Sequence, residues 1–372
     1  MLILLLAACT RPAPPPPTVA FRVDAVPSVA FRQGAPLPTL GPDARTDKGL
    51  QAAAEELASV ATTPDARLAP TAVRVALGRA GYPGDAHFVR VIGGGTEPPA
   101  ALLDAVPRGA PVDVAWAWRD LPDGRRWWVL GWAWRRIEMD ALPRDVALDA
   151  GISLRVDRAI EPRLIVGQPD GGVVEMSIVP GKSRWIDVFH VPGEYRIEVV
   201  DQDRVELLFS VYADQAPPPP SPLPGAARIP DLFDAQRTLY AELTALRARN
   251  GLPPLPVYGA FEPLARAHAT CLASTGEVAH TTPRCPGVPA MAGATYTPHA
   301  RHHEDVAAGD TAAEAWERLL DSPAHRLNLL CRTCSHAAIG VAAEPTVPSR
   351  LFVVWELLEF PDGMPTPIPR NR

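Results

Sequence analysis

Apolar residues recur at two different spacings in the first half of the chain. They lie three or four positions apart from Leu50 to Val60, as on one face of a helix. Residues 112–118 and 126–134 instead alternate between apolar and polar positions, and a Leu-Pro-Asp-Gly turn separates them. Helices followed by a β-hairpin predict an α+β domain over residues 46–140, whose function the sequence does not indicate.

Short alternating runs fill residues 147–213, and Gly, Pro and Asp residues separate them. The six runs are 152–156, 163–166, 173–178, 185–189, 195–200 and 205–211. Closely spaced short strands with turn residues between them are typical of two packed antiparallel sheets. The pattern therefore predicts a small β-sandwich.

Helical spacing returns in residues 231–360. Asp231 or Asp234 can cap a helix whose face carries leucines, and a second helix is expected over residues 258–275. Further helices are expected after Asp310 and from Ser322-Pro323, where Ser as N-cap and Pro at the first position are favoured. Strands at 337–343 and 351–358 complete a second α+β domain.

Proline is unusually abundant, with 44 residues in a chain of 372, and much of it is clustered. Residues 10–45 are Pro-rich and poor in apolar runs, which predicts a disordered tether. Residues 214–230 contain the run Ala-Pro-Pro-Pro-Pro-Ser-Pro, which predicts a linker between the second and third domains.

The first nine residues resemble a bacterial lipoprotein signal. An apolar run ends in Leu-Ala-Ala-Cys, so Cys9 would become the lipidated first residue of an exported protein held at a membrane. The departure is that no Lys or Arg precedes the run, and a chance apolar start is the alternative. No later stretch reaches the ~20 apolar residues of a membrane-spanning helix.

The other four cysteines all lie in the last third of the chain: Cys271, Cys285, Cys331 and Cys334. An even, clustered set in an exported protein predicts two disulfides, and three pairings are possible. We favour Cys271–Cys285 and Cys331–Cys334, because pairs that are close in sequence need the least folding to meet. Zinc bound by these thiols is the rival, although only one Cys-x-x-Cys spacing is present.

The net charge is −6, and the chain carries neither a basic stripe nor a nucleic-acid-binding motif. Nucleic acid is therefore not expected as a partner.

Several motifs of the last 130 residues resemble those of the CAP superfamily, the cysteine-rich secretory and pathogenesis-related proteins. The specific one is Ser322-Pro323-x-His325-Arg326-x-Asn328-Leu329-Leu330, which resembles the bacterial signature of that family. Weaker similarities are Asn250-Gly251-Leu252-Pro253, Leu264-Ala265-x-x-His268-Ala269 and Ile339-Gly340-Val341. The resemblance implies an α-β-α sandwich.

The resemblance also implies a site. In the family, two histidines and a glutamate line one cleft, and the matching residues are His280, Glu304 and His325. Two imidazoles and one carboxylate with an open position are a ligand set for zinc or another divalent cation. His303, Ser322 and Asn328 would line the same cleft. His303 replaces a glycine of the family pattern, so its side chain either adds a ligand or blocks the cleft.

Three functions are compatible with this pattern. The first, which we favour, is a binding module that holds a metal and a small or apolar ligand, or a cell-envelope component. The second is a hydrolase with metal-activated water and Glu304 as base, although no residue can be assigned as catalytic from the sequence. The third is a structural lipoprotein with a vestigial cleft. The region 46–140 is also a candidate for a degenerate CAP-like copy.

Overall fold

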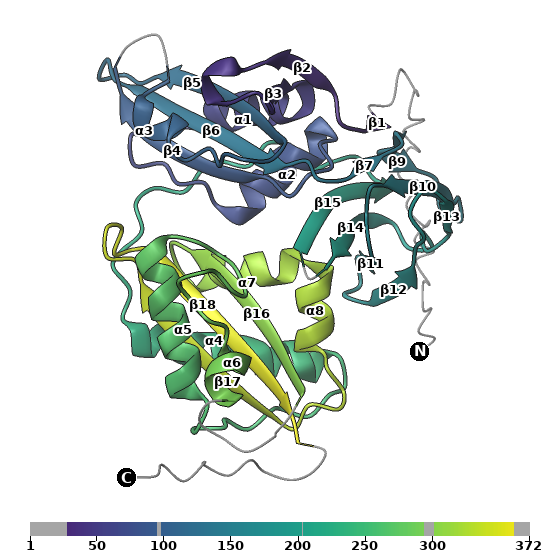
Figure 1. Ribbon diagram of the computed structural model, residues 1–372, viewed down its shortest axis with the longest axis vertical. Coiled ribbons are helices and arrows are strands. Elements are labelled where there is room, and N and C mark those ends of the chain that lie inside the picture. The colour runs from purple at the N-terminus through teal and green to yellow at the C-terminus, as the bar shows by residue number, and fades with distance from the viewer. Residues whose placement is uncertain (1–27, 95–97, 203, 294–300, 361–372) are drawn as a thin grey trace, which may run out of the picture.

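The computed structural model describes residues 28–94, 98–202, 204–293 and 301–360, which form three domains (Figure 1). The predicted signal, Cys9 and the first part of the tether lie outside the described residues. Among the helices of the described part, none combines the length and the apolar character that a membrane span needs.

A five-stranded sheet organises the N-terminal domain, with strand order β2-β3-β5-β6-β4. The strands are β2 (Gln33–Pro36), β3 (Ala44–Asp47), β4 (His87–Gly93), β5 (Val112–Asp120) and β6 (Arg126–Trp134). The helices are α1 (Lys48–Val60), α2 (Pro70–Ala80), α3 (Ala100–Leu103) and the 3-10 turn η1 (Pro38–Leu40). The helices and the hairpin predicted for 46–140 are present.

The predicted tether over residues 10–45 is wrong from Ser28 onward. Strand β1 (Ser28–Val29) pairs with β8 (Leu142–Pro143), and β3 runs parallel to β5 inside the sheet. The carboxylate of Asp47, at the end of β3, accepts hydrogen bonds from the backbone N–H groups of Gly49 and Leu50 and so caps α1. These contacts order a segment whose composition alone suggested disorder.

The middle domain is built from two sheets around one apolar core. The larger has the order β12-β11-β14-β15-β9, and the smaller has the order β13-β10-β7. The bounds are β7 (Glu138–Met139), β9 (Asp145–Val146), β10 (Ile152–Asp157), β11 (Pro162–Gly167), β12 (Val173–Ser177), β13 (Ser183–Ile186), β14 (Gly193–Asp201) and β15 (Arg204–Ala213). Each predicted strand overlaps an observed one, and the two sheets form a sandwich.

The segment 214–230 contains no helix or strand, yet it is not free of the N-terminal domain. Leu223 is buried in the core formed with α1 and α2. The backbone N–H of Arg67 donates to the Pro224 carbonyl at 2.8 Å. The linker therefore packs against the first domain before it enters the third.

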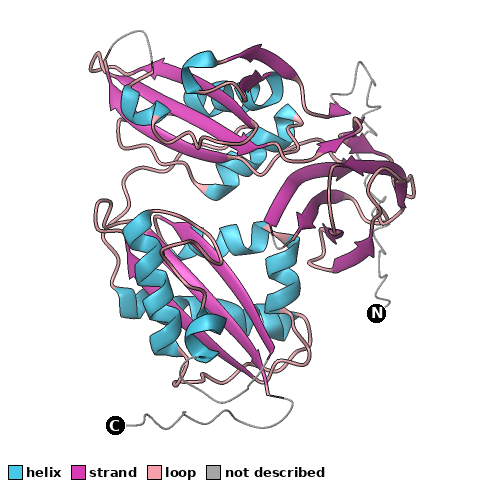
Figure 2. Ribbon diagram, in the orientation of Figure 1, coloured by secondary structure: helices cyan, strands magenta, loops and turns pink. Residues whose placement is uncertain are grey.

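The C-terminal domain places an antiparallel sheet, in the order β16-β18-β17, between helices on both faces (Figure 2). Its strands are β16 (Arg301–Gly309), β17 (His336–Ala343) and β18 (Leu351–Glu359). Its helices are α4 (Leu232–Arg249), α5 (Glu262–Thr275), α6 (Val288–Gly293), α7 (Ala312–Asp321) and α8 (Pro323–Leu329). The α-β-α sandwich implied by the resemblance is confirmed.

Alternation along β18 separates the two cores of this domain. Phe352 and Val354 pack with α5 and α6, whereas Val353 and Trp355 pack with α4 and α7. Successive side chains of a strand point to opposite faces, so this strand is apolar on both sides. The same alternation in β16 decides which of its polar residues can meet.

The strand order of the first domain contains the order of the third. β4 and β5 flank β6 in antiparallel pairs, as β16 and β17 flank β18. The first sheet adds β2 and β3, and only the four-residue α3 lies between β4 and the hairpin, where the third domain has α7 and α8. A degenerate copy stays a prediction.

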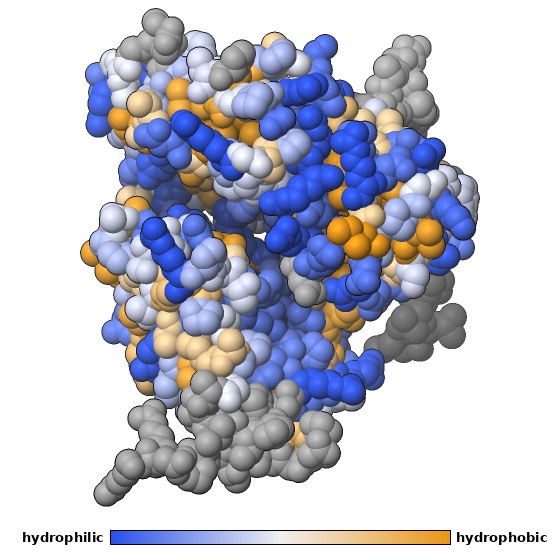
Figure 3. Space-filling view, viewed as in Figure 1, coloured by the Kyte–Doolittle hydropathy of each residue, from blue (hydrophilic) through white to orange (hydrophobic). Residues whose placement is uncertain are grey.

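The third domain contacts both of the others through polar side chains, and the space-filling view shows a largely hydrophilic junction (Figure 3). Arg67 of the first domain binds Glu314 of α7, and Arg74 of α2 lies 2.9 Å from Asp321. Glu198 of β14 accepts hydrogen bonds from Ser322 at the start of α8. Helix α8 is thus fixed by the neighbouring sandwich.

Candidate functional site

His280, Glu304 and His325 come together although they belong to three separate elements. Glu304 lies in β16, His280 follows α5, and His325 lies in the first turn of α8. Nδ1 of His280 is 3.0 Å from Oε1 of Glu304, and the His280 and His325 ring centroids are 6.4 Å apart. The residues chosen from the sequence therefore form one cluster.

His325 is held in place by the start of its helix. Ser322 caps α8 by accepting a hydrogen bond from the His325 N–H at 3.1 Å, and Pro323 occupies the first helical position. Burial, and then the nearby His280, lower the pKa of His325 to about 3, so its ring is neutral at pH 7. Its Nδ1 is buried and has no hydrogen-bond partner among the described residues.

Sequence reasoning missed the second carboxyl group of the cluster, Glu356. The register of β16 and β18 places Glu356 directly opposite Glu304, and it is fully buried. Burial and the neighbouring Glu304 carboxylate raise the pKa of Glu356 well above its usual value. Glu356 therefore keeps its proton and donates it in a hydrogen bond to Glu304. The available signal was one acidic residue inside the apolar run 351–358.

Burial alone would raise the pKa of Glu304, but its hydrogen bonds reverse this effect. Those with His280 and Glu356 lower the pKa of Glu304 below its ordinary value. On the other side, His302 places Nδ1 3.0 Å from Oε2 of Glu356. An ionised carboxylate is thus held beside His280, with a second layer of polar groups behind it.

His268 closes the inner side of this cluster. It lies on α5, is 1% exposed, and places Nε2 3.8 Å from Oε1 of Glu304. Burial lowers the pKa of His268, with Glu304 as the main opposing influence. The sequence suggested a buried core histidine, and the structure adds that this residue faces the carboxylate.

His303 and Asn328, predicted to line the same cleft, are directed elsewhere. His303 is the neighbour of Glu304 in β16, so its side chain points to the opposite face of the sheet, where Nε2 lies 3.3 Å from Oε1 of Glu359. The amide of Asn328 donates at 2.8 Å to the buried carboxylate of Asp305, whose pKa burial raises. His303 therefore neither joins nor blocks the His280 cluster.

Ser322 is also not a cleft residue. It is 4% exposed, and its hydroxyl donates to Glu198 of the sandwich at 2.9–3.0 Å while capping α8. The N–H of Ala324 donates to the same carboxylate at 2.7 Å. The cleft prediction overlooked Ser322's contact with the preceding domain.

The predicted disulfides are both present, as Cys271–Cys285 and Cys331–Cys334. The first ties α5 to the loop that follows His280. The second closes a turn directly after α8, close to His303 and Glu359. Each bridge thus stabilises the chain beside one of the two polar clusters on β16.

The His280 cluster suits a divalent cation. It offers imidazole nitrogens and a carboxylate, which are ligands that zinc accepts. The His280 side chain is 44% exposed, so an ion can approach it past the described residues. The partnerless Nδ1 of His325 and the neutral state of that ring fit a metal ligand, since a ligating imidazole must be unprotonated. The residues present therefore fit the implied metal.

A family model described as "Cysteine-rich secretory protein family", the CAP family, matches residues 240–355. This segment contains β16, β17, the first five residues of β18 and the three residues of the cluster. The third domain is therefore a CAP domain. No curated protein matches the chain.

Three solved structures are similar to parts of the chain. An outer surface protein from Borrelia burgdorferi is 19% identical, with a TM-score of 0.30, over 36% of this chain and 98% of that one. An extracellular protein containing an SCP domain from Bacillus anthracis is 15% identical, with a TM-score of 0.30, over 60% and 86%. A cysteine-rich secretory protein from Staphylococcus aureus is 14% identical, with a TM-score of 0.28, over 60% and 83%.

Proposed function

We propose that this chain is an exported CAP-domain protein that binds a divalent cation, with zinc as the first candidate, through His280, Glu304 and His325. The observation that carries the proposal is the meeting of Nδ1 of His280 with Oε1 of Glu304 at 3.0 Å, beside a neutral His325 ring. A cation in this place would replace the His280–Glu304 contact and use the partnerless nitrogen of His325.

The groups behind the ligands support this role. Glu356 hydrogen-bonds Glu304, and His302 contacts Glu356, so the carboxylate has a fixed orientation. Partners of this kind orient metal ligands and strengthen binding. The protein thus supplies the carboxylate already ionised, and the imidazole of His325 already neutral, at pH 7.

Export is proposed from the cysteines. Two disulfides in one domain are typical of an oxidising compartment, and the family is described as secretory. We propose in addition that Cys9 carries lipid and holds the protein at a membrane surface. Replacement of Cys9 by Ser should then move the full-length protein from the membrane fraction to the soluble fraction, and unchanged membrane association would exclude a lipid on Cys9.

A small or apolar ligand, or a cell-envelope component, is proposed to reach the same place over His280. One sizeable cavity of the described residues, of about 480 Å³, lies elsewhere, at the junction of all three domains near Arg74, Arg196 and Arg326. The metal is therefore the better-supported part of the function.

Calorimetric titration of the full chain with zinc tests the metal site. Both disulfides are kept oxidised, so that no thiol of the third domain competes for the ion. We expect one zinc per chain for the wild type and for His190→Ala, which alters an exposed histidine of the sandwich. The double variant His280→Ala, His325→Ala should lose this binding. Equal zinc binding by the wild type and the double variant would overturn the proposal and leave an exported scaffold.

A further inference from the structure

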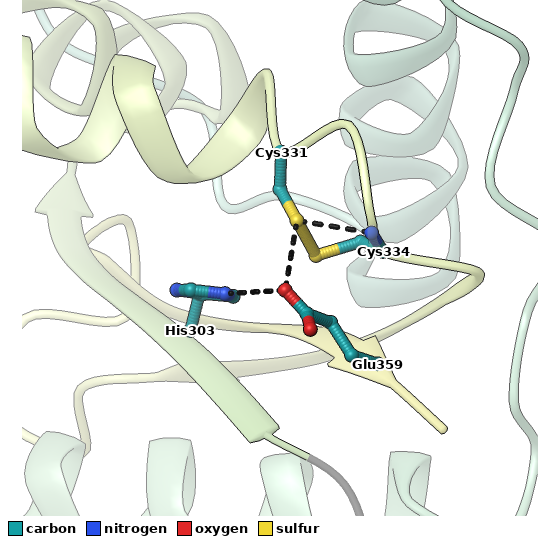
Figure 4. A group of neighbouring side chains, drawn as sticks. All are labelled: His303, Cys331, Cys334 and Glu359. Carbon is teal, nitrogen blue, oxygen red and sulfur yellow. Dashed lines mark hydrogen bonds and ion pairs between the residues drawn. A yellow bond between two sulfur atoms is a disulfide. The ribbon is translucent and has the colours of Figure 1, made fainter. Parts of the chain in front are cut away.

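A second cluster of metal-ligand residues lies on the opposite face of β16, and it includes a disulfide. His303 comes from β16, Glu359 ends β18, and Cys331 and Cys334 belong to the turn after α8 (Figure 4). One ligand atom from each residue lies within 4.8 Å of the other three. The proposed cation site at His280, Glu304 and His325 uses none of them.

Two of the distances match those between the ligand atoms of a metal centre. Nε2 of His303 is 3.3 Å from Oε1 of Glu359, and Sγ of Cys331 is 3.7 Å from the same oxygen. In a tetrahedron the ligand atoms are about 1.6 bond lengths apart, which for Zn–N, Zn–O and Zn–S bonds gives roughly 3.3–3.8 Å. The imidazole and the carboxylate therefore stand where zinc would need them.

The two sulfur atoms are the exception, because they are bonded to each other. A disulfide sulfur is not a thiolate and does not bind zinc as one. A Cys-x-x-Cys turn suits both states, since the same spacing forms a disulfide or supplies two zinc ligands. Opening the bridge is the only covalent change that the cluster needs.

We propose that His303, Cys331, Cys334 and Glu359 form a second zinc site. The site is available only after the Cys331–Cys334 disulfide has been reduced. The oxidised chain holds one cation at the His280 cluster, and the reduced chain holds a second at this one. The ligand set, with two thiolates, one imidazole and one carboxylate, is closed and tetrahedral, as in structural zinc sites.

The chemistry requires a thiol reductant, and a dithiol satisfies it. One thiolate of the dithiol attacks Sγ of Cys331, which is partly exposed, whereas Cys334 is 6% exposed. Cys334 leaves as a thiolate, and the second thiol of the reductant then releases Cys331 and closes the reductant's own disulfide. Two electrons pass to the protein, and zinc binding displaces the protons from both thiols.

The opened turn would offer the thiolate of Cys331 a backbone donor, and the ion would neutralise the nearby carboxylate of Glu359. The backbone N–H of Cys334 points at Sγ of Cys331 at 3.0 Å and would stabilise a thiolate there. Thr333 donates its hydroxyl to Glu359 and so orients the carboxylate toward the sulfurs. The His303 side chain is 35% exposed, which leaves an entry path for the ion.

Cobalt(II) added to the full chain tests the proposal, because thiolate-bound cobalt has a charge-transfer absorption that nitrogen- or oxygen-bound cobalt lacks. We expect this absorption after anaerobic reduction with a dithiol and removal of the reductant, and none before reduction. His303→Ala and Glu359→Gln should each weaken cobalt binding by more than about tenfold, since even residues behind the ligands have this effect. Zinc should displace the cobalt.

The control for the other bridge is Cys331→Ser, Cys334→Ser, which keeps Cys271 and Cys285 as the only possible thiols among the described residues. Reduced control protein should show no thiolate–cobalt absorption. Absorption by the reduced control protein would overturn the proposal. So would a lack of absorption by reduced wild type whose free thiols have been titrated and whose circular dichroism spectrum is unchanged. The variant His280→Ala, His325→Ala should keep the absorption, which separates this site from the proposed function.

Discussion

The two faces of strand β16 hold two polar clusters of different kinds. Glu304 faces His280 and Glu356, and its cluster contains imidazoles and carboxyl groups alone. His303, one residue earlier, faces Glu359 and a disulfide. A step of one residue thus separates the two proposed sites, one with imidazole and carboxylate ligands and one whose thiolates depend on reduction. Neighbours in a sequence motif need not share a site.

Removing one carboxylate ligand from either face of β16 should give the largest effects on metal binding. Glu304→Ala is expected to weaken zinc binding by the oxidised chain by more than about 100-fold, beyond the effect of losing a partner behind the ligands. The same substitution should leave the thiolate–cobalt absorption of the reduced chain unchanged. Glu359→Ala should do the reverse. Calorimetry and absorption spectra give both readouts, and loss of both signals in either variant would mean that the faces are coupled.

The stability of the helix that carries His325 should depend on pH through Glu198. Burial raises the pKa of Glu198 to about 7 from its ordinary value of 4.5, so the folded chain binds this proton more tightly than the unfolded chain. The free energy of unfolding should therefore fall as the pH rises from about 4.5 to about 7, by at most about 3 kcal/mol, and level off above.

Glu198→Gln is the matched control for this pH dependence. The amide still accepts a hydrogen bond but does not titrate, so this contribution should disappear from urea denaturation curves recorded across the pH range. Identical pH profiles for the variant and the wild type would show that Glu198 titrates normally in the folded chain.

Asn328→Ala tests whether Asn328 acts on stability through Asp305 and not on the cation site. The variant removes the 2.8 Å hydrogen bond to Asp305, which is completely buried. An unsatisfied buried carboxyl group should lower the free energy of unfolding by about 1–3 kcal/mol, as measured by urea denaturation. Zinc binding at the His280 cluster should not change. A loss of zinc affinity together with unchanged stability would place Asn328 in the site after all.

Glu356→Gln should have a smaller effect on zinc binding than loss of a ligand. The amide can still donate a hydrogen bond to Glu304, but it removes the shared proton and alters the contact with His302. We expect zinc affinity to fall by about 10-fold, at the lower end for residues behind metal ligands. No change in affinity would mean that Glu356 has only a structural role, whereas complete loss would make it a ligand.

Much of this architecture could be predicted because the apolar pattern is regular. The alternating runs of 147–213 predicted the sandwich strands, and the segment Ser322-Pro323 predicted the start of α8. Strand β16 was not predicted, because its first half is Arg-His-His-Glu-Asp and shows no apolar alternation. Its strand geometry comes from pairing with β18, which is information that a local pattern does not contain.

The site was predictable only where its residues belong to local motifs. His280, Glu304 and His325 could be found through the family motifs, but Glu356 could not, because its partner lies 52 residues earlier and meets it only through the register. Ser322 was assigned to the cleft through the family motif, which contains no information on its contact with Glu198 of another domain. Long-range pairing and domain contacts, rather than local propensity, account for the errors.

Zinc K-edge X-ray absorption on the oxidised, zinc-loaded full chain tests the central claim most directly. We predict nitrogen and oxygen ligands alone, at about 2.0–2.2 Å, with at least two imidazoles bound to the zinc. A sulfur shell near ~2.3 Å would contradict it. A chain that retains no zinc after gel filtration would contradict it as well.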